Sequence, residues 1–106
     1  MEYEEALLVR MFFGENDRHG DKPLYKHVVE LCRKRGIAGA TVFRGLLGYG
    51  KSSVIHKVGL LGLSSDLPML VEIIDCEEKL KQILPELAEL LKGGIITVER
   101  VKVLKT

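Results

Sequence analysis

The sequence of 106 residues carries little net charge, because 16 lysine and arginine residues stand against 15 aspartate and glutamate residues. The two kinds are interspersed, which excludes the extended basic surface that duplex nucleic acid or an anionic membrane would need. Any anion site must therefore be local. The chain also lacks an apolar run near the roughly 20 residues of a membrane-spanning helix, and its start, MEYEEALLVR, is acidic. We expect a cytoplasmic protein with no nucleic-acid partner.

Cysteine is scarce and histidine is scattered. Cys32 and Cys76 are far apart and each lies among apolar residues, so neither a metal-binding nor a redox spacing is present. We expect two buried free thiols; the alternative, a disulfide between them, is disfavoured by a cytoplasmic location. His19, His27 and His56 have no carboxylate or thiol beside them at metal spacing, so we predict surface histidines and no metal site.

The sequence also lacks an identifiable nucleophile with an adjacent base, and it lacks paired carboxylates on one predicted element. We therefore do not expect an enzyme. A hydrophobic content of 46% with 29% charged residues is typical of globular proteins. At this length we expect one domain over residues 1–106, with a core so small that oligomerisation contributes to its stability.

Hydrophobic periodicity predicts four strands and two helices. Strands are expected over residues 5–13, 37–45, 67–75 and 95–106, where apolar residues alternate with polar ones or form a short run. The first helix is expected to begin at Pro23 and to end at Gly36 after a basic last turn. The second helix has a wide apolar stripe, made of Leu80, Ile83, Leu84, Leu87, Leu90 and Leu91. A long loop is expected over about residues 48–66.

Single residues predict the details of the second helix. Asp75 with Glu78 has the spacing of a capping box, so we expect Asp75 to cap the helix start. Pro85 lies inside the helix and predicts a kink or a short break near residues 81–84. In the strand that follows, the alternation changes parity around Glu99 and Arg100, which predicts a bulge or a bend.

The order of the elements is strand, helix, strand, strand, helix, strand. This order predicts an α+β, ferredoxin-like βαββαβ domain, a four-stranded antiparallel sheet with two helices on one face. The first strand carries apolar residues on both faces, with Leu8 and Phe12 opposite Val9 and Met11, and the third strand does the same. We expect a second copy of the chain to cover the free face.

Arg10 and Arg44 each interrupt an apolar strand, and an interior-facing guanidinium needs an anionic partner. Two interpretations fit this placement. The first is an ion pair at a subunit interface, with Glu72 as a candidate partner, and the second is a bound phosphate group. We favour the ion pair slightly.

The run Gly45–Ser52, GLLGYGKS, matches the phosphate-loop pattern G-x-x-x-x-G-K-S/T. In that pattern glycine amides face phosphate oxygens, the lysine neutralises their charge and the hydroxyl binds magnesium. A helix must also begin at Lys51, yet the following residues, SSVIHKVGLLGLSSD, are poor helix formers. A phosphate-loop hydrolase is therefore a minor hypothesis. The plain alternative is a flexible glycine-rich turn with one exposed lysine.

The stretch GATVFRGLLGYGKSSVIH resembles the second strand and loop base of PII-type signalling proteins, with Gly48-Tyr49-Gly50 in place of their G-F-G segment. Together with SSDLPMLVEIID, LPELAEL and GGIITVERV, it is similar more specifically to an uncharacterised PII-like family of short bacterial and archaeal proteins. The resemblance covers nearly the whole chain. It implies a homotrimer whose sheets face inward and whose inter-subunit clefts bind an adenine nucleotide: ADP, AMP or ATP.

The resemblance also implies the site residues. The positions that it assigns to nucleotide binding are Thr41, Gly48, Tyr49, Gly50, Lys51, Ser52, Glu72, Ile74, Gly93 and Gly94. Gly93 and Gly94 fall where PII proteins hold the phosphates, although the longer lysine-bearing loop of PII is absent. Lys102 and Lys105 stand where PII has C-terminal arginines, so Lys102 joins Arg10 and Arg44 as a candidate for phosphate or interface contacts.

The resulting functional hypothesis is a PII-like regulator rather than an enzyme. Residues 51–66 would change conformation with the ligand and contact a protein partner, such as a membrane transporter or an enzyme. No tyrosine lies between Lys51 and Asp66, so the uridylylation site of enterobacterial PII is absent. The alternative from another class is a CutA-like structural or metal-tolerance trimer that binds no nucleotide.

Overall fold

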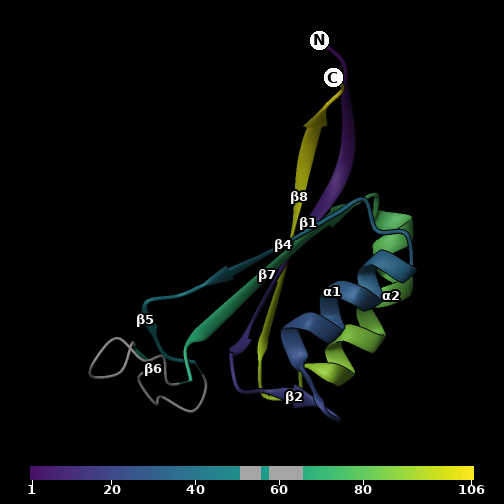
Figure 1. Ribbon diagram of the computed structural model, residues 1–106. Coiled ribbons are helices and arrows are strands. Elements are labelled where there is room, and N and C mark those ends of the chain that lie inside the picture. The colour runs from purple at the N-terminus through teal and green to yellow at the C-terminus, as the bar shows by residue number, and fades with distance from the viewer. Residues whose placement is uncertain (51–55, 58–65) are drawn as a thin grey trace.

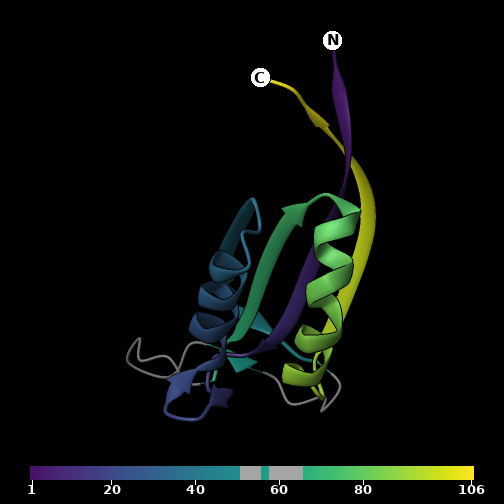
Figure 2. The same ribbon diagram turned by 90° about the vertical axis from the view of Figure 1, so that its right-hand side faces the viewer.

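A four-stranded antiparallel sheet forms the centre of the computed structural model, which describes residues 1–50, 56–57 and 66–106. Its strands are β1 (Tyr3–Gly14), β4 (Gly39–Arg44), β7 (Pro68–Asp75) and β8 (Ile95–Leu104), in the spatial order β4-β7-β1-β8. The helices α1 (Leu24–Lys34) and α2 (Glu77–Leu90) lie side by side on one face (Figures 1 and 2). The predicted ferredoxin-like α+β fold is confirmed.

Two short ribbons flank the sheet. One joins β2 (Arg18–His19) to β3 (Lys22–Pro23) ahead of α1, and the other joins β5 (Leu47–Gly48) to β6 (His56–Lys57). In the second ribbon Leu47 pairs with Lys57 and Gly48 with His56. The segment predicted as a loop from about residue 48 to 66 therefore begins in a paired strand. Lys51 and the four residues after it lie outside the described residues, so the absence of a helix at Lys51 stays a prediction.

The core lies between the sheet and the two helices. Val9, Met11, Val71 and Ile73 are 0% exposed, as their alternation predicts. The helices supply Leu24, Val28 and Cys32 from α1 and Leu80, Ile83 and Leu87 from α2, residues spaced by three or four along each helix. At about 1.5–3 kcal/mol per fully buried aliphatic side chain, this layer is the main favourable term in folding.

The ends of α1 follow the sequence signals. The helix begins directly after Pro23, and its basic last turn is followed by Gly36 with a φ of 74°. The start of α2 differs from the prediction, because Cys76 rather than Asp75 occupies the N-cap. The predicted capping box is therefore wrong. Asp75 is the last residue of β7, and its carboxylate accepts hydrogen bonds from the amides of Cys76 and Ala38.

The Asp75 carboxylate connects the edge of the sheet to the helix layer. Its Oδ1 accepts a hydrogen bond from the Cys76 amide at 2.7 Å, and its Oδ2 accepts one from the Ala38 amide at 2.9 Å. Burial on its own would raise the pKa of Asp75, but the hydrogen bonds from Cys76 and Ala38 outweigh it, so the pKa lies below its usual range. The charged carboxylate thus helps to join the start of β4 to the start of α2.

Of the irregularities predicted, the short break in the second helix and the bulge in the last strand are wrong. The helix α2 continues through Pro85 from Glu77 to Leu90, so the expected short break is absent from this described segment. The pairing of β1 with β8 keeps one register from Tyr3–Leu104 to Phe12–Ile95, which leaves no bulge at Glu99 and Arg100 in these described strands.

The parity change in β8 has another cause. The two strands extend past the helices as a projecting ribbon (Figure 1). In the body of the sheet Ile96 and Val98 face the helices, because they pair with Met11 and Val9. Along the ribbon the apolar residues Val101 and Val103 lie on the opposite face. The apolar pattern changes face where the helices end, while the pairing of β8 with β1 keeps one register.

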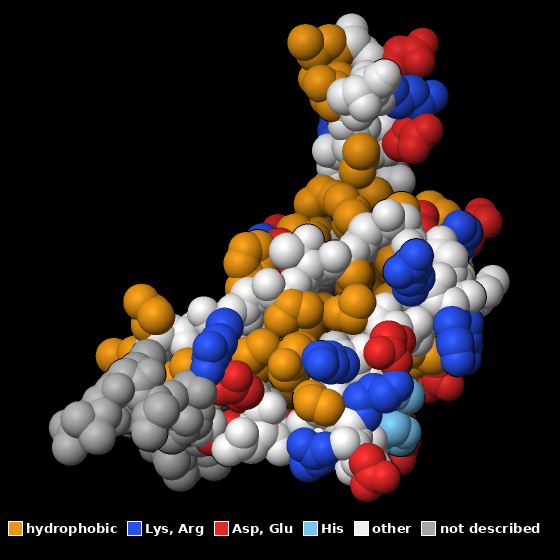
Figure 3. All heavy atoms as spheres, in the orientation of Figure 1, with side chains coloured by type: hydrophobic (Ala, Val, Ile, Leu, Met, Phe, Trp, Pro, Cys, Tyr) orange, Lys and Arg blue, Asp and Glu red, His pale blue; other side chains and the backbone are white. Residues whose placement is uncertain are grey.

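The face of the sheet away from the helices carries apolar side chains that the chain leaves partly exposed. One row crosses all four strands, because Phe43 pairs with Leu70, Leu70 with Phe12, and Phe12 with Ile95. The exposed fractions of Phe43, Phe12 and Ile95 are 48%, 38% and 39%. In the orientation of Figure 1 the helices lie beside the sheet, and Figure 3 shows hydrophobic side chains along the strands below the projecting ribbon. We call the face of the sheet away from the helices the open face.

The two cysteines differ in environment. Both are free thiols, but Cys32 is buried and Cys76 is exposed, so the prediction of two buried thiols is wrong for Cys76. Burial raises the pKa of the Cys32 thiol to about 11.

Within residues 1–50, 56–57 and 66–106, no helix combines the length and the apolar character needed to cross a membrane.

Candidate functional site

A cleft of about 690 Å³ lies where the strands end near β5. The last residues of β1 and β4 and the first residues of β7 and β8 line it, together with β5 and the turn after α2. Four aromatic side chains contribute to its walls: Phe12, Phe13, Phe43 and Tyr49. A hollow of this size, apolar and rich in aromatic rings with a few charged groups, suits a small organic ligand.

Close packing of glycines against Pro68 shapes one wall. A Cβ at Gly45 would lie 2.6 Å from Pro68 Cγ, and the Gly45 amide donates a hydrogen bond to the Pro68 carbonyl at 2.7 Å. A Cβ at Gly48 would lie 3.2 Å from the same Cγ atom. Gly45 and Gly48 therefore let the chain cross the start of β7. Around Gly50, no atom of the described residues lies within 4 Å of the place a Cβ would take.

The opposite wall is the turn between α2 and β8. Gly93 has a φ of 88°, which an L side chain rarely adopts. A Cβ at Gly94 would lie 2.7 Å from the Phe12 carbonyl oxygen, and the Gly94 amide donates to the Leu91 carbonyl at 2.7 Å. These glycines, predicted from sequence to lie beside a ligand, line the same cleft as Gly48, Tyr49 and Gly50. The fold thus brings together two glycine segments that are far apart in the sequence.

Other predicted site residues lie elsewhere. Thr41 and Glu72 pair across β4 and β7 on the open face, and Ile74 lies two residues further along β7. None of these three is among the described residues that line the cleft. Lys51 and Ser52 lie outside the described residues.

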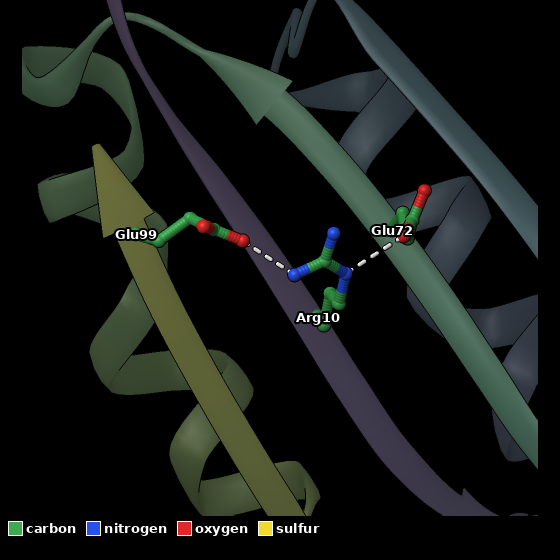
Figure 4. A network of polar contacts seen from close by, with 3 residues as sticks. All are labelled: Arg10, Glu72 and Glu99. Atoms are coloured by element: carbon green, nitrogen blue, oxygen red, sulfur yellow. Dashed lines mark hydrogen bonds and ion pairs between the residues drawn. The ribbon is translucent and has the colours of Figure 1, made fainter. Parts of the chain in front are cut away.

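Arg10 forms an ionic cluster on the open face (Figure 4). Its Nε lies 2.9 Å from Glu72 Oε2, and its Nη1 bonds Glu99, so one cation from β1 bridges β7 and β8. Hydrogen bonds to Glu72 and then to Glu99 raise the pKa of the guanidinium further. Glu72 is thus a partner of Arg10, as predicted, but within one chain. The cluster holds two carboxylates for one guanidinium.

Arg44 and Lys102 differ in their distance from the cleft. Arg44 lines it, and its Nε lies 3.1 Å from Glu15 Oε2. Lys102 lies on the projecting ribbon, where it pairs in register with Glu5. The hypothesis of a phosphate contact therefore has a geometric basis for Arg44 and lacks one for Lys102.

Sequence reasoning missed several lining residues, chiefly Phe12, Phe43 and the acids Asp17 and Asp66. The alternation of β1 and β4 contained a signal, because Phe12 and Phe43 stand on the face opposite the core. The register that puts them in one row is not visible in either strand alone. Asp17 and Asp66 come from two loops, and only the folded chain joins them: the Asn16 amide donates to Asp66 Oδ1 at 2.8 Å.

The histidines do not form a metal centre in the described part of the chain, where no three His, Cys, Asp or Glu side chains converge. His19 and His27 instead stack, with ring centroids 3.9 Å apart and planes inclined by 21°. Burial, and then the positive charges of His19 and Lys22, lower the pKa of His27. The pair lies on the α1 side, outside the cleft lining.

Comparison with known sequences gives matches over nearly the whole chain. A family model described as "Uncharacterized ACR" (DUF190) matches residues 6–103. A UPF0166 protein of Aquifex aeolicus is 47% identical over 107 residues, with 98% of each chain covered. A UPF0166 protein of Methanocaldococcus jannaschii is 34% identical over 95 residues, covering 89% of this chain and 87% of the relative.

Comparison with solved structures shows a PII-like fold. CPII, a nitrogen regulatory PII-like protein from Thiomonas intermedia K12 bound to ADP, AMP and bicarbonate, matches with a TM-score of 0.75. The identity is 14%, and the match covers 98% of this chain and 92% of CPII. A candidate PII-like signalling protein from Thermus thermophilus matches with a TM-score of 0.70 and 24% identity, over 98% of this chain and 94% of the other. The predicted resemblance to PII-like proteins is confirmed.

Proposed function

The chain belongs to the DUF190 family, and from this premise we propose that it is a PII-like regulatory protein that binds an adenine nucleotide. The observation that carries the proposal is the convergence of Gly48–Gly50 with Gly93 and Gly94 around one aromatic cleft. CPII, which shares the fold, was solved with ADP and AMP. We infer that the ligand is ADP, AMP or ATP and that the protein acts in the cytoplasm.

The cleft has separate surfaces for the parts of a nucleotide. Phe43 and Tyr49 are 48% and 72% exposed, so they are free to stack on a purine ring, an arrangement typically worth about 1–3 kcal/mol per base. The glycine walls expose main chain near the hollow, which suits a sugar or phosphate oxygen. Arg44 supplies a guanidinium at the edge. Binding rather than catalysis is the chemistry that we assign to these groups.

Assembly into a homotrimer is the second part of the proposal. The apolar row Phe43, Leu70, Phe12 and Ile95 begins at the cleft and continues across the open face. If copies of the chain cover each other's open faces, the cleft lies at the boundary between subunits. An exposed apolar surface of this kind is more often an interface than a free surface.

Signalling through residues 51–66 to a protein partner, a membrane transporter or an enzyme, completes the proposal. The ribbon of β5 and β6 supports it, because Gly48 pairs with His56 and so links the cleft wall directly to this segment. A ligand that binds one arrangement of the ribbon more tightly would shift the population of the segment.

Titration calorimetry with AMP, ADP and ATP, alongside sedimentation equilibrium, tests binding and assembly together. We expect a trimer with saturable nucleotide binding. A trimer that gives no heat with any nucleotide would contradict the proposal in favour of a CutA-like structural role. Sustained phosphate release that Lys51→Ala abolishes would instead revive the hydrolase hypothesis.

The variant Gly50→Val tests the cleft itself. We expect at least about tenfold weaker nucleotide binding with an unchanged trimer, because the new side chain enters the cleft, where it meets no atom of the described residues within 4 Å. Ala40→Val is the matched control, since it adds bulk on exposed β4 outside the lining residues. Loss of the trimer in Gly50→Val would mean that this glycine serves packing between subunits.

A further inference from the structure

An ion pair crosses the start of β7 at the edge of the cleft. Arg44, the last residue of β4, pairs in register with Met69. Glu15 comes directly after β1, whose last residue, Gly14, pairs with Pro68. Arg44 Nε lies 3.1 Å from Glu15 Oε2, and Arg44 Nη2 lies 3.4 Å from Glu15 Oε1. The carboxylate therefore occupies one side of the guanidinium.

The carboxylate is the fixed partner of this pair. The Glu15 amide donates a hydrogen bond to the Leu67 carbonyl at 2.8 Å, and the next amide, that of Asn16, donates to Asp66 Oδ1 at 2.8 Å. The Glu15 side chain is 21% exposed, whereas that of Arg44 is 48% exposed. Because these bonds hold the turn that carries Glu15, the carboxylate stays in place and the guanidinium is the partner that is accessible to a ligand.

The guanidinium keeps donors for a second anion. An arginine side chain has five N–H groups, and Glu15 contacts only Nε and Nη2. Arg44 Nη1 has no hydrogen-bond or ion-pair partner among the described residues. Arg44 lines the cleft, whereas Glu15 is not one of the described lining residues. A ligand in the cleft therefore meets the guanidinium before the carboxylate, and a phosphate group suits its planar set of donors.

From this arrangement we propose that Arg44 contacts the phosphate of a nucleotide, and that Glu15 is a positioning residue that holds the guanidinium and weakens its attraction for anions. A free phosphate ion would have to share the guanidinium with a carboxylate that is already in place. A phosphate attached to a nucleoside is held nearby by the aromatic walls, so its effective concentration at Arg44 is far higher. The inference rests on the proposed function and deepens it, because it restricts the ligand to a nucleoside that carries a phosphate.

Titration calorimetry with adenosine, AMP and inorganic phosphate tests the ligand class. We expect AMP to bind about tenfold more tightly than adenosine, and inorganic phosphate to give no saturable heat. Equal affinities for AMP and adenosine, or saturable binding of inorganic phosphate, would overturn the inference while leaving recognition of the base intact. Failure of adenosine and of every adenine nucleotide to bind would instead overturn the proposed function.

The variant Arg44→Met tests the contact with the phosphate. The affinity for AMP should fall about tenfold, to near that for adenosine, because a charge-assisted contact is lost. The affinity for adenosine should change less than about twofold, which also shows that the cleft remains folded. Arg33→Met is the control, since it removes the same charge from an exposed position of α1 outside the described lining. A loss for both ligands in Arg44→Met, or an equal loss of AMP affinity in Arg33→Met, would contradict the contact.

The variant Glu15→Gln tests the positioning residue. Glutamine keeps an oxygen that can accept from the guanidinium, so one charge is removed while the contact is retained. We expect the affinity for AMP to rise about threefold and that for adenosine to stay unchanged. In the Arg44→Met background the same substitution should leave AMP affinity nearly unchanged, because no guanidinium remains to be shared. Equal rises in both backgrounds, or no rise in Glu15→Gln alone, would contradict a role for Glu15 through Arg44.

Discussion

The two faces of the central sheet are built from the same strands but differ in how far the folded chain buries them. On the helix face Val9, Met11, Val71 and Ile73 are fully buried. One residue away in each strand, the open face leaves apolar side chains such as Phe12 half-exposed and places an ion pair among them. The first face is completed by the chain's own helices. The second is apolar and is covered by none of the described segments, which is why we propose that it contacts other copies.

The variants Ile73→Ala and Ile74→Ala test this contrast most strongly, because neighbouring identical residues point to opposite faces. Ile73→Ala should cost about 2–5 kcal/mol in the free energy of unfolding, as is typical of a cavity in a filled core. Ile74 is only partly buried, so Ile74→Ala should cost distinctly less in the dilute protomer and should weaken assembly instead. Urea unfolding at low protein concentration and sedimentation at several concentrations separate the two effects. Equal losses in unfolding free energy would show that both faces belong to one core.

The variant Asp75→Ala loosens the helix layer at its edge. Loss of the hydrogen bonds from the Cys76 and Ala38 amides should cost about 1–3 kcal/mol at neutral pH. The folded pKa of Asp75 is depressed, so its contribution is present above the unfolded pKa of about 3.9 and is lost as the pH falls through the folded pKa. Thermal unfolding of both proteins from pH 7 to pH 3 should therefore show the difference shrinking below about pH 4. A difference that stays constant across this range would mean that packing, not charge, explains the loss.

The variant Arg10→Met gives the smallest expected change in folding, yet it acts on the open face. It removes the cation between Glu72 and Glu99 and leaves two carboxylates facing each other. Because the pair is partly solvated, we expect little change in the unfolding of the dilute protomer. The variant should dissociate at protein concentrations at which the unaltered protein remains assembled, because uncompensated charge at an interface is costly in free energy. Lys26→Met, with the same change of charge at an exposed position of α1 on the helix side of the sheet, is the control, and an equal loss of assembly in both would contradict a specific role for the cluster.

The fold was predicted from the sequence, but some contacts at the edge of the sheet were not. Alternation in β1 and β7 and the three-and-four spacing in α2 were enough to predict the order of the elements and the fold, because these patterns repeat over many residues. The role of Asp75 was predicted wrongly. A carboxylate at the end of a strand can cap the following helix or bond a neighbouring segment, and the sequence does not show that the Ala38 amide lies close to it.

The cleft was predictable only in part, for a similar reason. Gly48, Gly50, Gly93 and Gly94 were identified through a family resemblance, and the structure places all four in one lining. Phe12 and Phe43 were not, because they meet through the register of β1, β7 and β4. The tight contact of Gly45 with Pro68 is likewise a property of two distant segments, and neither residue type indicates it alone.

The continuous pairing of β1 with β8 has a mechanical consequence. Tyr3 pairs with Leu104 at the projecting end of the two strands, and Phe12 pairs with Ile95 at the other end, in the body of the sheet. Tension applied across Tyr3 and Leu104 would load the hydrogen-bonded pairs one after another and peel the strands apart at low force. The same tension applied between Tyr3 and Ile95 would act along the strands and strain all the pairs at once. The domain should therefore be mechanically anisotropic, soft when opened from the projecting ribbon and stiff when sheared along it.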